Sequence, residues 1–172
     1  MKTQFNIGNL EFSKPIVQGG MGIGISLSRL AGNVSKFGGL GVLSAVEMGS
    51  DYPNYQKNPK EANRQAMEDH FKRAKEISGN RPIGLNIMVA LTQYEQLVKD
   101  AVQTGYDIIF AGAGLPLTLP ELTRNSLTKI SPIISSKRVA KLILKHWWRH
   151  YEVAPDAIVL EVKLIVGLED SF

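Results

Sequence analysis

Residues 15–45 read PIVQGGMGIGISLSRLAGNVSKFGGLGVLSA, and this stretch decides the fold class. A short apolar run, 15–18, leads into glycines at positions 19, 20, 22 and 24, followed by a helix-like segment and a second glycine-edged apolar run. Glycine adopts positive φ and lets a ligand approach the backbone without an intervening Cβ atom. The pattern therefore predicts a βαβ unit with a flat or charged ligand at the end of its first strand.

The rest of the chain alternates apolar runs with helical segments in the same way. Strands are expected at 15–18, 39–45, 82–89, 107–111, 130–135 and 157–162, and helices at 26–37, 61–77, 92–104 and 136–150, with a short helix between Pro116 and Thr123. The strand runs are continuously apolar, which is typical of a parallel sheet buried on both faces. Ser26 and Thr92 are the expected N-caps, and Glu95 completes a capping box with Thr92.

Repeated βα units predict an α/β fold with right-handed crossovers, either an open doubly wound sheet or a (βα)8 barrel. The six expected strands fall short of the eight in a full barrel, which typically spans about 250 residues. A Rossmann fingerprint is only partly matched, because no third glycine follows Gly22-Ile23-Gly24, although Glu47 lies near the end of the second strand. The polar insertion 52–60 would lie at the carboxyl rim of a barrel as a lid or an ordinary surface loop.

Composition limits the class of protein. The 172 residues are 44% hydrophobic and 21% charged, with a net charge of +4 and no cysteine. These values predict one folded domain without disulfide or thiolate chemistry. The sequence contains neither an apolar run long enough to span a membrane nor an N-terminal secretory signal, so a soluble, cytoplasmic protein is expected.

A basic segment lies between Glu121 and Glu152, which enclose no other acidic residue. Its cations at positions 137, 141, 145 and 149 recur every four residues, as on one face of a helix. They form either a patch for a polyanion or a solvated helix face, and the helical spacing favours the solvated face, with Val139, Leu142 and Ile143 buried opposite it. No nucleic-acid or membrane partner is expected.

Other candidate ligand-binding residues lie at the ends of the expected strands. Asn86 is an amide within the apolar run GLNIMV, where it requires a polar partner: either a flavin ring edge or a neighbouring loop. Gly112, Ala113 and Gly114 follow the fourth strand and leave room for a ring or a substrate. Ser135 and Ser136 follow the fifth strand and would bind a ligand or cap the next helix.

The three histidines, His70, His146 and His150, all fall on expected helices. Catalytic residues of barrels gather at the carboxyl ends of strands, so none of the three is expected to be catalytic. His146 and His150 are one helical turn apart, but the sequence offers no third ligand, and no metal site is expected. Trp147 and Trp148 are expected to pack or to cover an interface.

Several sequence blocks, taken together and in order, resemble the nitronate monooxygenase (2-nitropropane dioxygenase) family and, more distantly, enoyl-acyl carrier protein reductase II. The resemblance runs from about Phe5 to Glu161, and QGGMG followed by ISLSRLAG is closer to the monooxygenase branch. The matching blocks are PIVQGGMGIGISLSRLAG, GGLGVLSA, GLNIMVA, DIIFAGAGLPLTLPEL, ISPIISSKRVAK and PDAIVLE.

The resemblance implies an FMN-binding (βα)8 TIM barrel that oxidises alkyl nitronates with O₂. It places the first glycine loop beside the flavin, together with residues at the ends of later strands. The implied cofactor-binding residues are Gly19, Gly20, Met21, Gly22, Asn86, Gly112, Ala113, Gly114 and Ser135. An enoyl-acyl carrier protein reductase II-like flavoprotein is the alternative enzyme.

The sequence departs from the family pattern after Glu161. There the family has a glycine-rich segment with its catalytic histidine, whereas this chain reads VKLIVGLEDSF, which suggests a frameshifted or premature ending. Residues 1–161 are therefore expected to form a partial barrel of about six strands, and 162–172 an atypical tail. The resemblance also assigns the FMN phosphate to strands seven and eight, so FMN binding and activity are expected to be weak, or the chain to be an inactive remnant. The open sheet edges of such a barrel favour a homo-oligomer.

Overall fold

The structure is a computed structural model that describes residues 5–161. The predicted tail 162–172 lies outside the described residues. In chain order the elements are β1 (Phe5–Ile7), β2 (Leu10–Phe12), α1 (Ser28–Lys36), β3 (Gly41–Ser44), α2 (Pro59–Ser78), β4 (Ile83–Met88), α3 (Tyr94–Thr104), β5 (Ile108–Gly112), α4 (Leu119–Leu122), β6 (Lys129–Ile134), α5 (Lys137–Tyr151) and β7 (Val159–Leu160).

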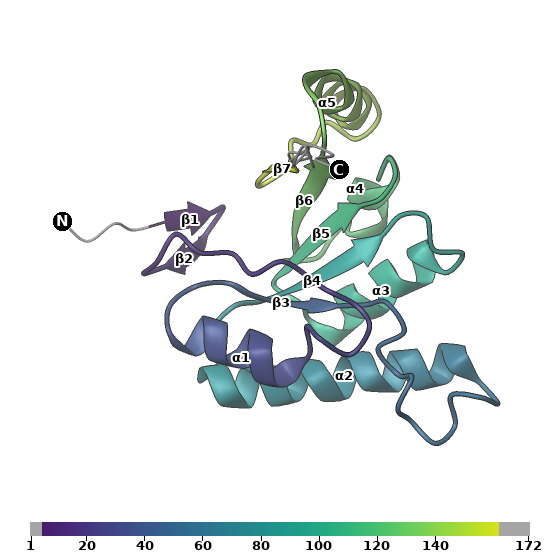
Figure 1. Ribbon diagram of the computed structural model, residues 1–172. Coiled ribbons are helices and arrows are strands. Elements are labelled where there is room, and N and C mark those ends of the chain that lie inside the picture. Colours follow the sequence, from purple (N-terminus) through teal and green to yellow (C-terminus); the bar gives the residue numbers. More distant parts are fainter. Residues whose placement is uncertain (1–4, 162–172) are drawn as a thin grey trace, which may run out of the picture.

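The central sheet confirms the barrel rather than the doubly wound alternative. Its five strands are parallel and neighbour one another in chain order, β3-β4-β5-β6-β7, and the sheet curls into part of a barrel (Figure 1). A doubly wound sheet would instead reverse its strand order at a switch point. The predicted first strand at 15–18 adds to the β3 edge only through a single parallel bridge between Val17 and Leu40. With that bridging segment, residues 5–161 supply six strands of an incomplete (βα)8 barrel.

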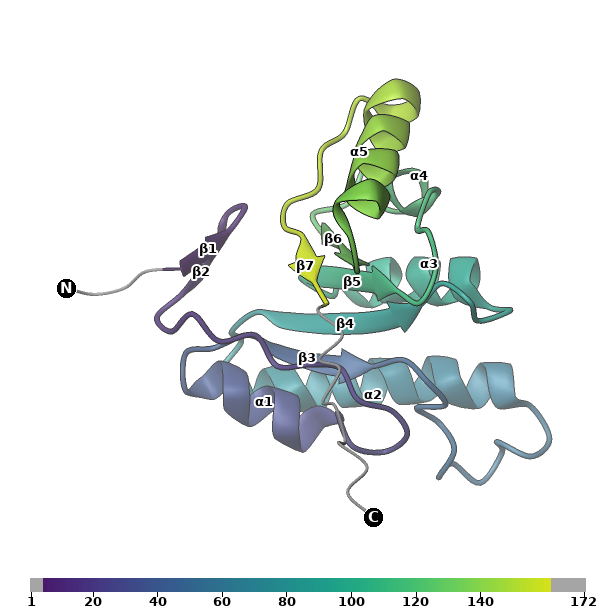
Figure 2. The same ribbon diagram turned by 45° about the horizontal axis from the view of Figure 1, so that its top comes forward.

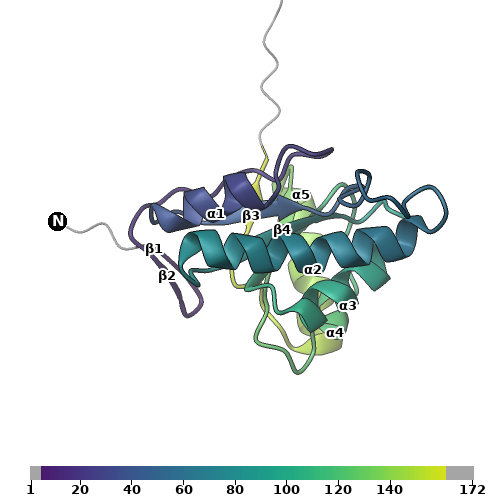
Figure 3. The same cartoon turned by 90° about the horizontal axis from the view of Figure 1, so that it is seen from below.

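Helices cover the convex face of the sheet, where the larger of two hydrophobic clusters lies. Ile83, Leu85 and Ile87 of β4 all point into this cluster, because alternate residues of a strand face the same side. Seen from below, α1, α2 and α3 run beneath the sheet (Figure 3). Glycines permit the closest contacts, since a Cβ on Gly41 would lie 1.8 Å from the carbonyl oxygen of Ala31 in α1.

The concave face is partly filled by the hairpin of β1 and β2, which the sequence analysis did not anticipate (Figure 2). Ile7 and Phe12 of this hairpin are buried against Val42, Ile108 and Phe110 of the sheet, forming the second hydrophobic cluster. The hairpin therefore closes one end of the concave face and leaves the remainder open.

Two aspartates tie neighbouring strands together at their amino ends. Asp107 precedes β5, and its Oδ2 accepts hydrogen bonds of 2.7 Å from the backbone N–H of Ile83 and from Lys75 Nζ. Asp156 precedes β7 in the same way, and its Oδ2 accepts a 2.9 Å hydrogen bond from the N–H of Ile130. These carboxylates replace backbone partners that the strand ends lack.

Two of the predicted helix caps are wrong. The N-cap of α1 is Leu27 rather than Ser26, and the N-cap of α3 is Gln93 rather than Thr92, and neither makes a side-chain cap. The Ser26 hydroxyl instead accepts a hydrogen bond from the backbone N–H of Met21. The Ser26 side chain, which the local sequence favours as a cap, thus makes its hydrogen bonds with the preceding loop instead of with the helix. Ser136, in contrast, does cap α5, where its Oγ accepts from the N–H of Val139.

Helix α5 buries Ile143 and Trp147, one turn apart, against the rest of the fold. The prediction that Leu142 is buried is wrong, because this side chain is 45% exposed. It lies about 100° around the helix from Ile143 and so misses the packed stripe. None of the helices between residues 5 and 161 combines the length and the apolar character needed to cross a membrane.

Candidate functional site

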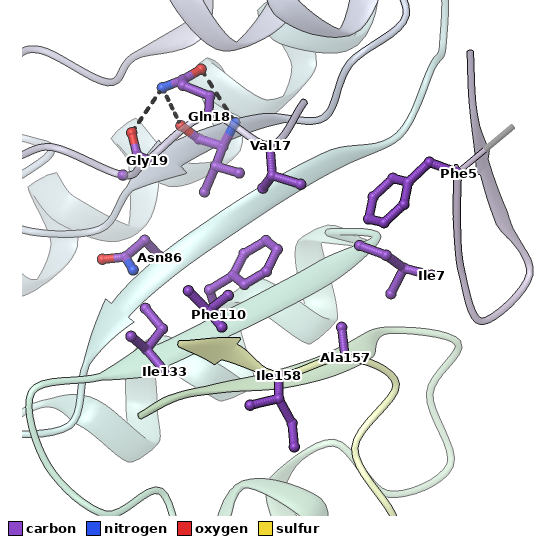
Figure 4. Close-up of a pocket in the computed structure, with 13 residues that line it drawn as sticks. Phe5, Ile7, Val17, Gln18, Gly19, Asn86, Phe110, Ile133, Ala157 and Ile158 are labelled. Carbon is purple, nitrogen blue, oxygen red and sulfur yellow. Dashed lines mark hydrogen bonds between the residues drawn. The ribbon is translucent and has the colours of Figure 1, made fainter. Parts of the chain in front are cut away.

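A cavity of about 220 Å³ opens on the concave face of the sheet (Figure 4). Its walls come from the β1 hairpin, from the segment 17–20, from β3 to β6 and from the residues around β7. The lining residues are Phe5, Ile7, Val17, Gln18, Gly19, Gly20, Val42, Asn86, Phe110, Ile133, Ala157, Ile158 and Val159. None of these described residues is titratable, so polar character in the cavity comes from amide groups alone.

Asn86 supplies the polar side chain on the sheet side of the cavity. It is in register with Ser44 of β3 and Phe110 of β5, and this row faces the concave side. The Asn86 amide makes no hydrogen bond to any residue within 5–161, so the alternative of a neighbouring loop as its partner finds no support in that part of the chain. A polar amide without a protein partner at a cavity wall is available to a ligand.

The glycine loop lies directly over Asn86. A Cβ placed on Gly20 would come within 2.4 Å of Asn86 Cβ, a distance that no real side chain tolerates. A Cβ on Gly22 would lie 3.2 Å from Ser44 Oγ and 2.9 Å from Val46 Cβ. Only glycine therefore lets the backbone of this loop approach the Ser44–Asn86 row.

Gln18 connects the loop to the sheet, as the dashed lines of Figure 4 show in part. Its Nε2 donates to the Val42 carbonyl oxygen and to Ser26 Oγ, both at 2.9 Å. Ser26 Oγ accepts a further hydrogen bond from the Met21 N–H and lies 3.2 Å from the Gly19 carbonyl oxygen. The position of the loop is thus fixed by side-chain hydrogen bonds.

Three of the predicted site residues, Gly19, Gly20 and Asn86, meet at the cavity. Met21 and Gly22 belong to the same loop but do not line the cavity, and the Met21 side chain is 60% exposed. Their assignment to a cofactor stays a prediction.

The remaining predicted residues lie at the carboxyl ends of β5 and β6, outside the cavity lining. A Cβ on Gly112 would meet Ile133 at 2.9 Å, so this glycine permits close packing of side chains on the concave face. Ala113 and Gly114, directly after β5, both have positive φ, at 53° and 148°. Ser135 is exposed just after β6. These four residues surround the same end of the sheet, and their role stays a prediction.

Sequence reasoning missed Gln18 and the hairpin residues Phe5 and Ile7 as parts of the site. Gln18 carried a signal, because a polar residue at the end of an apolar strand requires a partner just as Asn86 does. Phe5 and Ile7 carried none, since their position against the sheet depends on long-range packing.

The histidines lie away from the cavity, on α2 and α5, as predicted. The rings of His146 and His150 pack against each other in a tilted arrangement, with centroids 4.3 Å apart. Within residues 5–161 no three histidine or acidic side chains gather in a way that would hold a metal ion.

His70 provides a test of pH dependence. Burial is the main cause that lowers the pKa of its imidazole below the ordinary value of 6.5, and Arg73 acts in the same direction. The unfolded chain then binds the proton more readily, so the stability from neutral His70 is complete above about pH 6.5 and declines as the pH falls below it. We expect the free energy of unfolding to decrease from about pH 7 to pH 5, and to decrease less in His70→Asn. Urea denaturation at each pH measures both slopes, and equal slopes would contradict the prediction.

Comparisons with known proteins agree with this architecture. FabK from Thermotoga maritima superposes with a TM-score of 0.66 at 22% identity, over 87% of this chain and 40% of that one. Nitroalkane oxidase from Streptomyces ansochromogenes superposes with a TM-score of 0.59 at 18% identity, over 78% of this chain and 44% of that one. At these identities the likeness shows the fold alone, and the chain spans about two fifths of the length of these proteins.

Sequence comparison gives the family. None of the curated proteins matches the sequence. Residues 4–165, however, match the family model described as nitronate monooxygenase, which covers most of the chain. The chain therefore belongs to the nitronate monooxygenase family, a family of flavin-dependent oxidoreductases.

Proposed function

We propose that this chain carries the ring-facing wall of an FMN site in an enzyme that oxidises alkyl nitronates with O₂. The observation that carries the proposal is the unpartnered amide of Asn86 beneath Gly20, at a cavity with otherwise apolar walls. Family membership supports the redox class, and the geometry supports the placement of a flat ring.

The residues of the cavity fit part of a flavin. Val17, Val42, Phe110 and Ile133 offer an apolar wall for a planar ring, and Asn86 offers both a donor and an acceptor to its polar edge. At about 220 Å³ the cavity is smaller than the roughly 300–1,000 Å³ of sites that enclose whole ligands. The described lining contains no lysine or arginine, so these residues would recognise the ring rather than the phosphate.

FMN would supply the redox chemistry, by taking electrons from the nitronate and passing them on to O₂. The apolar wall would exclude water from the ring, and the Asn86 amide would fix its orientation. None of the three histidines belongs to the described lining, and no other side chain of that lining can act as a base. The preferred substrate is therefore a preformed nitronate, whose carbon has already lost the proton, rather than the neutral nitroalkane.

A flavin titration of the full chain tests the proposal. We expect FMN and riboflavin to bind weakly and with affinities within about threefold of each other, because the described contacts are with the ring and a charge-assisted phosphate contact would favour FMN by more. Quenching of flavin fluorescence measures both affinities, with free flavin mononucleotide in buffer as the reference. Absence of binding by both flavins would contradict the proposal.

Turnover then distinguishes the substrates. Oxygen uptake with propyl-2-nitronate should exceed that with neutral 2-nitropropane at the same pH, because only the neutral compound needs a base. NADH oxidation coupled to an enoyl thioester, without uptake of oxygen with nitronate, would instead favour the reductase alternative.

A further inference from the structure

The glycine loop 19–25 is held in place by a closed set of hydrogen bonds around two side chains. Gln18 Nε2 donates to Ser26 Oγ and to the Val42 carbonyl oxygen, and Gln18 Oε1 lies 3.4 Å from the Val42 N–H. Gln18 thereby pairs with β3 through its side chain as a strand would through its backbone. Its own backbone N–H donates to the Leu40 carbonyl oxygen at 3.0 Å.

Ser26 uses all of its hydrogen-bonding capacity within this set. A serine hydroxyl can donate once and accept twice. Ser26 Oγ accepts from Gln18 Nε2 and from the Met21 N–H, both at 2.9 Å, and donates to the Gly19 carbonyl oxygen at 3.2 Å. The side chain is 1% exposed, so water does not compete for these contacts.

Apolar packing contributes little to holding the loop. Met21, Ile23 and Ile25 are the large side chains of the loop, and they are 60%, 53% and 62% exposed. Two backbone hydrogen bonds also reach the loop, from the Ser26 N–H to the Met21 carbonyl oxygen and from the Leu27 N–H to the Ile25 carbonyl oxygen, and Ser26 itself is joined to β3 through the Ser44 N–H. Loss of the side-chain contacts would therefore leave the segment 19–25 held by these two backbone contacts.

Two polar groups of residues that line the cavity stay outside this set. The backbone N–H of Gly20 donates to no residue within 5–161, and neither does the Asn86 amide that lies beneath it. A loop that keeps such groups unpaired while its own contacts are satisfied is organised for a ligand in advance, which removes an ordering cost from binding.

We propose that Gln18 and Ser26 are positioning residues that hold the glycine loop in its ligand-binding conformation before any ligand binds. The inference rests on the proposed function for the identity of the ligand, a flavin. It does not depend on that function for the order of the loop itself, which can be measured in the ligand-free chain.

Hydrogen exchange of the full chain, followed residue by residue with NMR, tests the inference without flavin. In Gln18→Glu the carboxylate cannot donate to Ser26 Oγ or to the Val42 carbonyl oxygen, whereas the protonated carboxyl can donate to one of them. We express the protection factor of the Met21 N–H relative to that of Leu85 in β4. We expect this ratio to fall about tenfold at pH 8 and to recover at about pH 3.5, below the ordinary glutamate pKa of about 4.3, while the ratio in wild type stays constant. Protection factors are corrected for the pH dependence of intrinsic exchange.

Two further variants sharpen the test. Ser26→Ala removes the acceptor of the Met21 N–H and should lower its protection at both pH values. Gln103→Glu, at an exposed position on α3 without a side-chain hydrogen bond to residues within 5–161, is the matched control and should leave Met21 unchanged. Protection at Leu85 in β4 serves as the internal reference for global stability, and at a given pH it should be the same in each variant as in wild type.

The outcomes separate the inference from the proposed function. Wild-type protection of Met21 in Gln18→Glu at pH 8, or an equal loss at both pH values, would overturn the inference. If Gln18 orders the loop and the wild-type chain binds flavin, the flavin affinity of Gln18→Glu should also fall about tenfold at pH 8, in proportion to the lost loop order. Failure of the wild-type chain to bind any flavin would overturn the proposed function alone, because the exchange result is obtained without ligand.

Discussion

Replacing Gly20 with alanine is expected to weaken flavin binding by at least about tenfold while leaving the fold intact. A Cβ at this position would lie 2.4 Å from Asn86 Cβ and 3.0 Å from Asn86 Cγ, so the loop must move away from the sheet. The contact is with Asn86 Cβ, which a change of rotamer does not displace. The shift would separate the loop from Asn86, the two groups proposed to contact the ring.

Gly19→Ala is the matched control for this change. Its Cβ would meet only Met21 Cε, at 4.0 Å, which is an ordinary van der Waals contact. We therefore expect its free energy of unfolding to stay within about 0.5 kcal/mol of wild type, which shows that a methyl group in this loop is tolerated where it makes no close contact with the protein. Fluorescence titration measures the affinities for riboflavin and FMN, and urea denaturation shows whether either variant loses stability. Wild-type flavin affinity in Gly20→Ala would refute the assignment of this loop to the flavin.

Truncation of Trp147 to alanine is expected to have the largest effect on stability, about 3–5 kcal/mol. The side chain is 0% exposed and lies within the hydrophobic cluster between the sheet and the helices. Its Nε1 also donates a 2.9 Å hydrogen bond to the buried Pro116 carbonyl oxygen, which joins α5 to the segment before α4. The variant thus leaves both a cavity and an unpaired acceptor.

The adjacent Trp148 offers a control of the same chemistry. It is 65% exposed, so Trp148→Ala should change the free energy of unfolding by no more than about 0.5 kcal/mol. If Trp147→Ala fails to fold, Trp147→Phe keeps an aromatic ring, loses the hydrogen bond and should cost about 1–3 kcal/mol. Urea denaturation measures all three, and similar losses for the two tryptophans would contradict the packing described above.

Periodicity in the sequence was enough to predict the order of strands and helices in the sheet. Continuous apolar runs such as 82–89 and 107–111 are typical of a parallel sheet covered on both faces, and the helices between them supply the crossovers. Local signals were less reliable at helix starts. Ser26 has the side chain of a cap but is used by the glycine loop, because its hydroxyl meets Gln18 and Met21 in the folded chain.

For the candidate site, too, the sequence revealed some residues but not the contacts between them. Gly20 and Asn86 could be chosen from the sequence because each is unusual in its local context: one lacks a side chain at a strand end, and the other is polar within an apolar strand. That they lie in contact is decided by the register of β4 and the course of the loop, which bring positions 66 residues apart together. Gln18 and the hairpin residue Phe5 enter the site for the same reason.

Residue patterns along the chain were enough to predict the fold class, the family and the glycine segment that faces the concave side of the sheet. Which polar groups are satisfied and which remain free became clear from the folded chain alone, because hydrogen-bond partners distant in sequence are set by packing. The Ser26 hydroxyl accepts two hydrogen bonds and donates one, which is all it can make, whereas the Asn86 amide has no hydrogen-bond partner within residues 5–161. On that difference rest the two proposals, Asn86 as a ligand contact and Ser26 as a support for the loop above it.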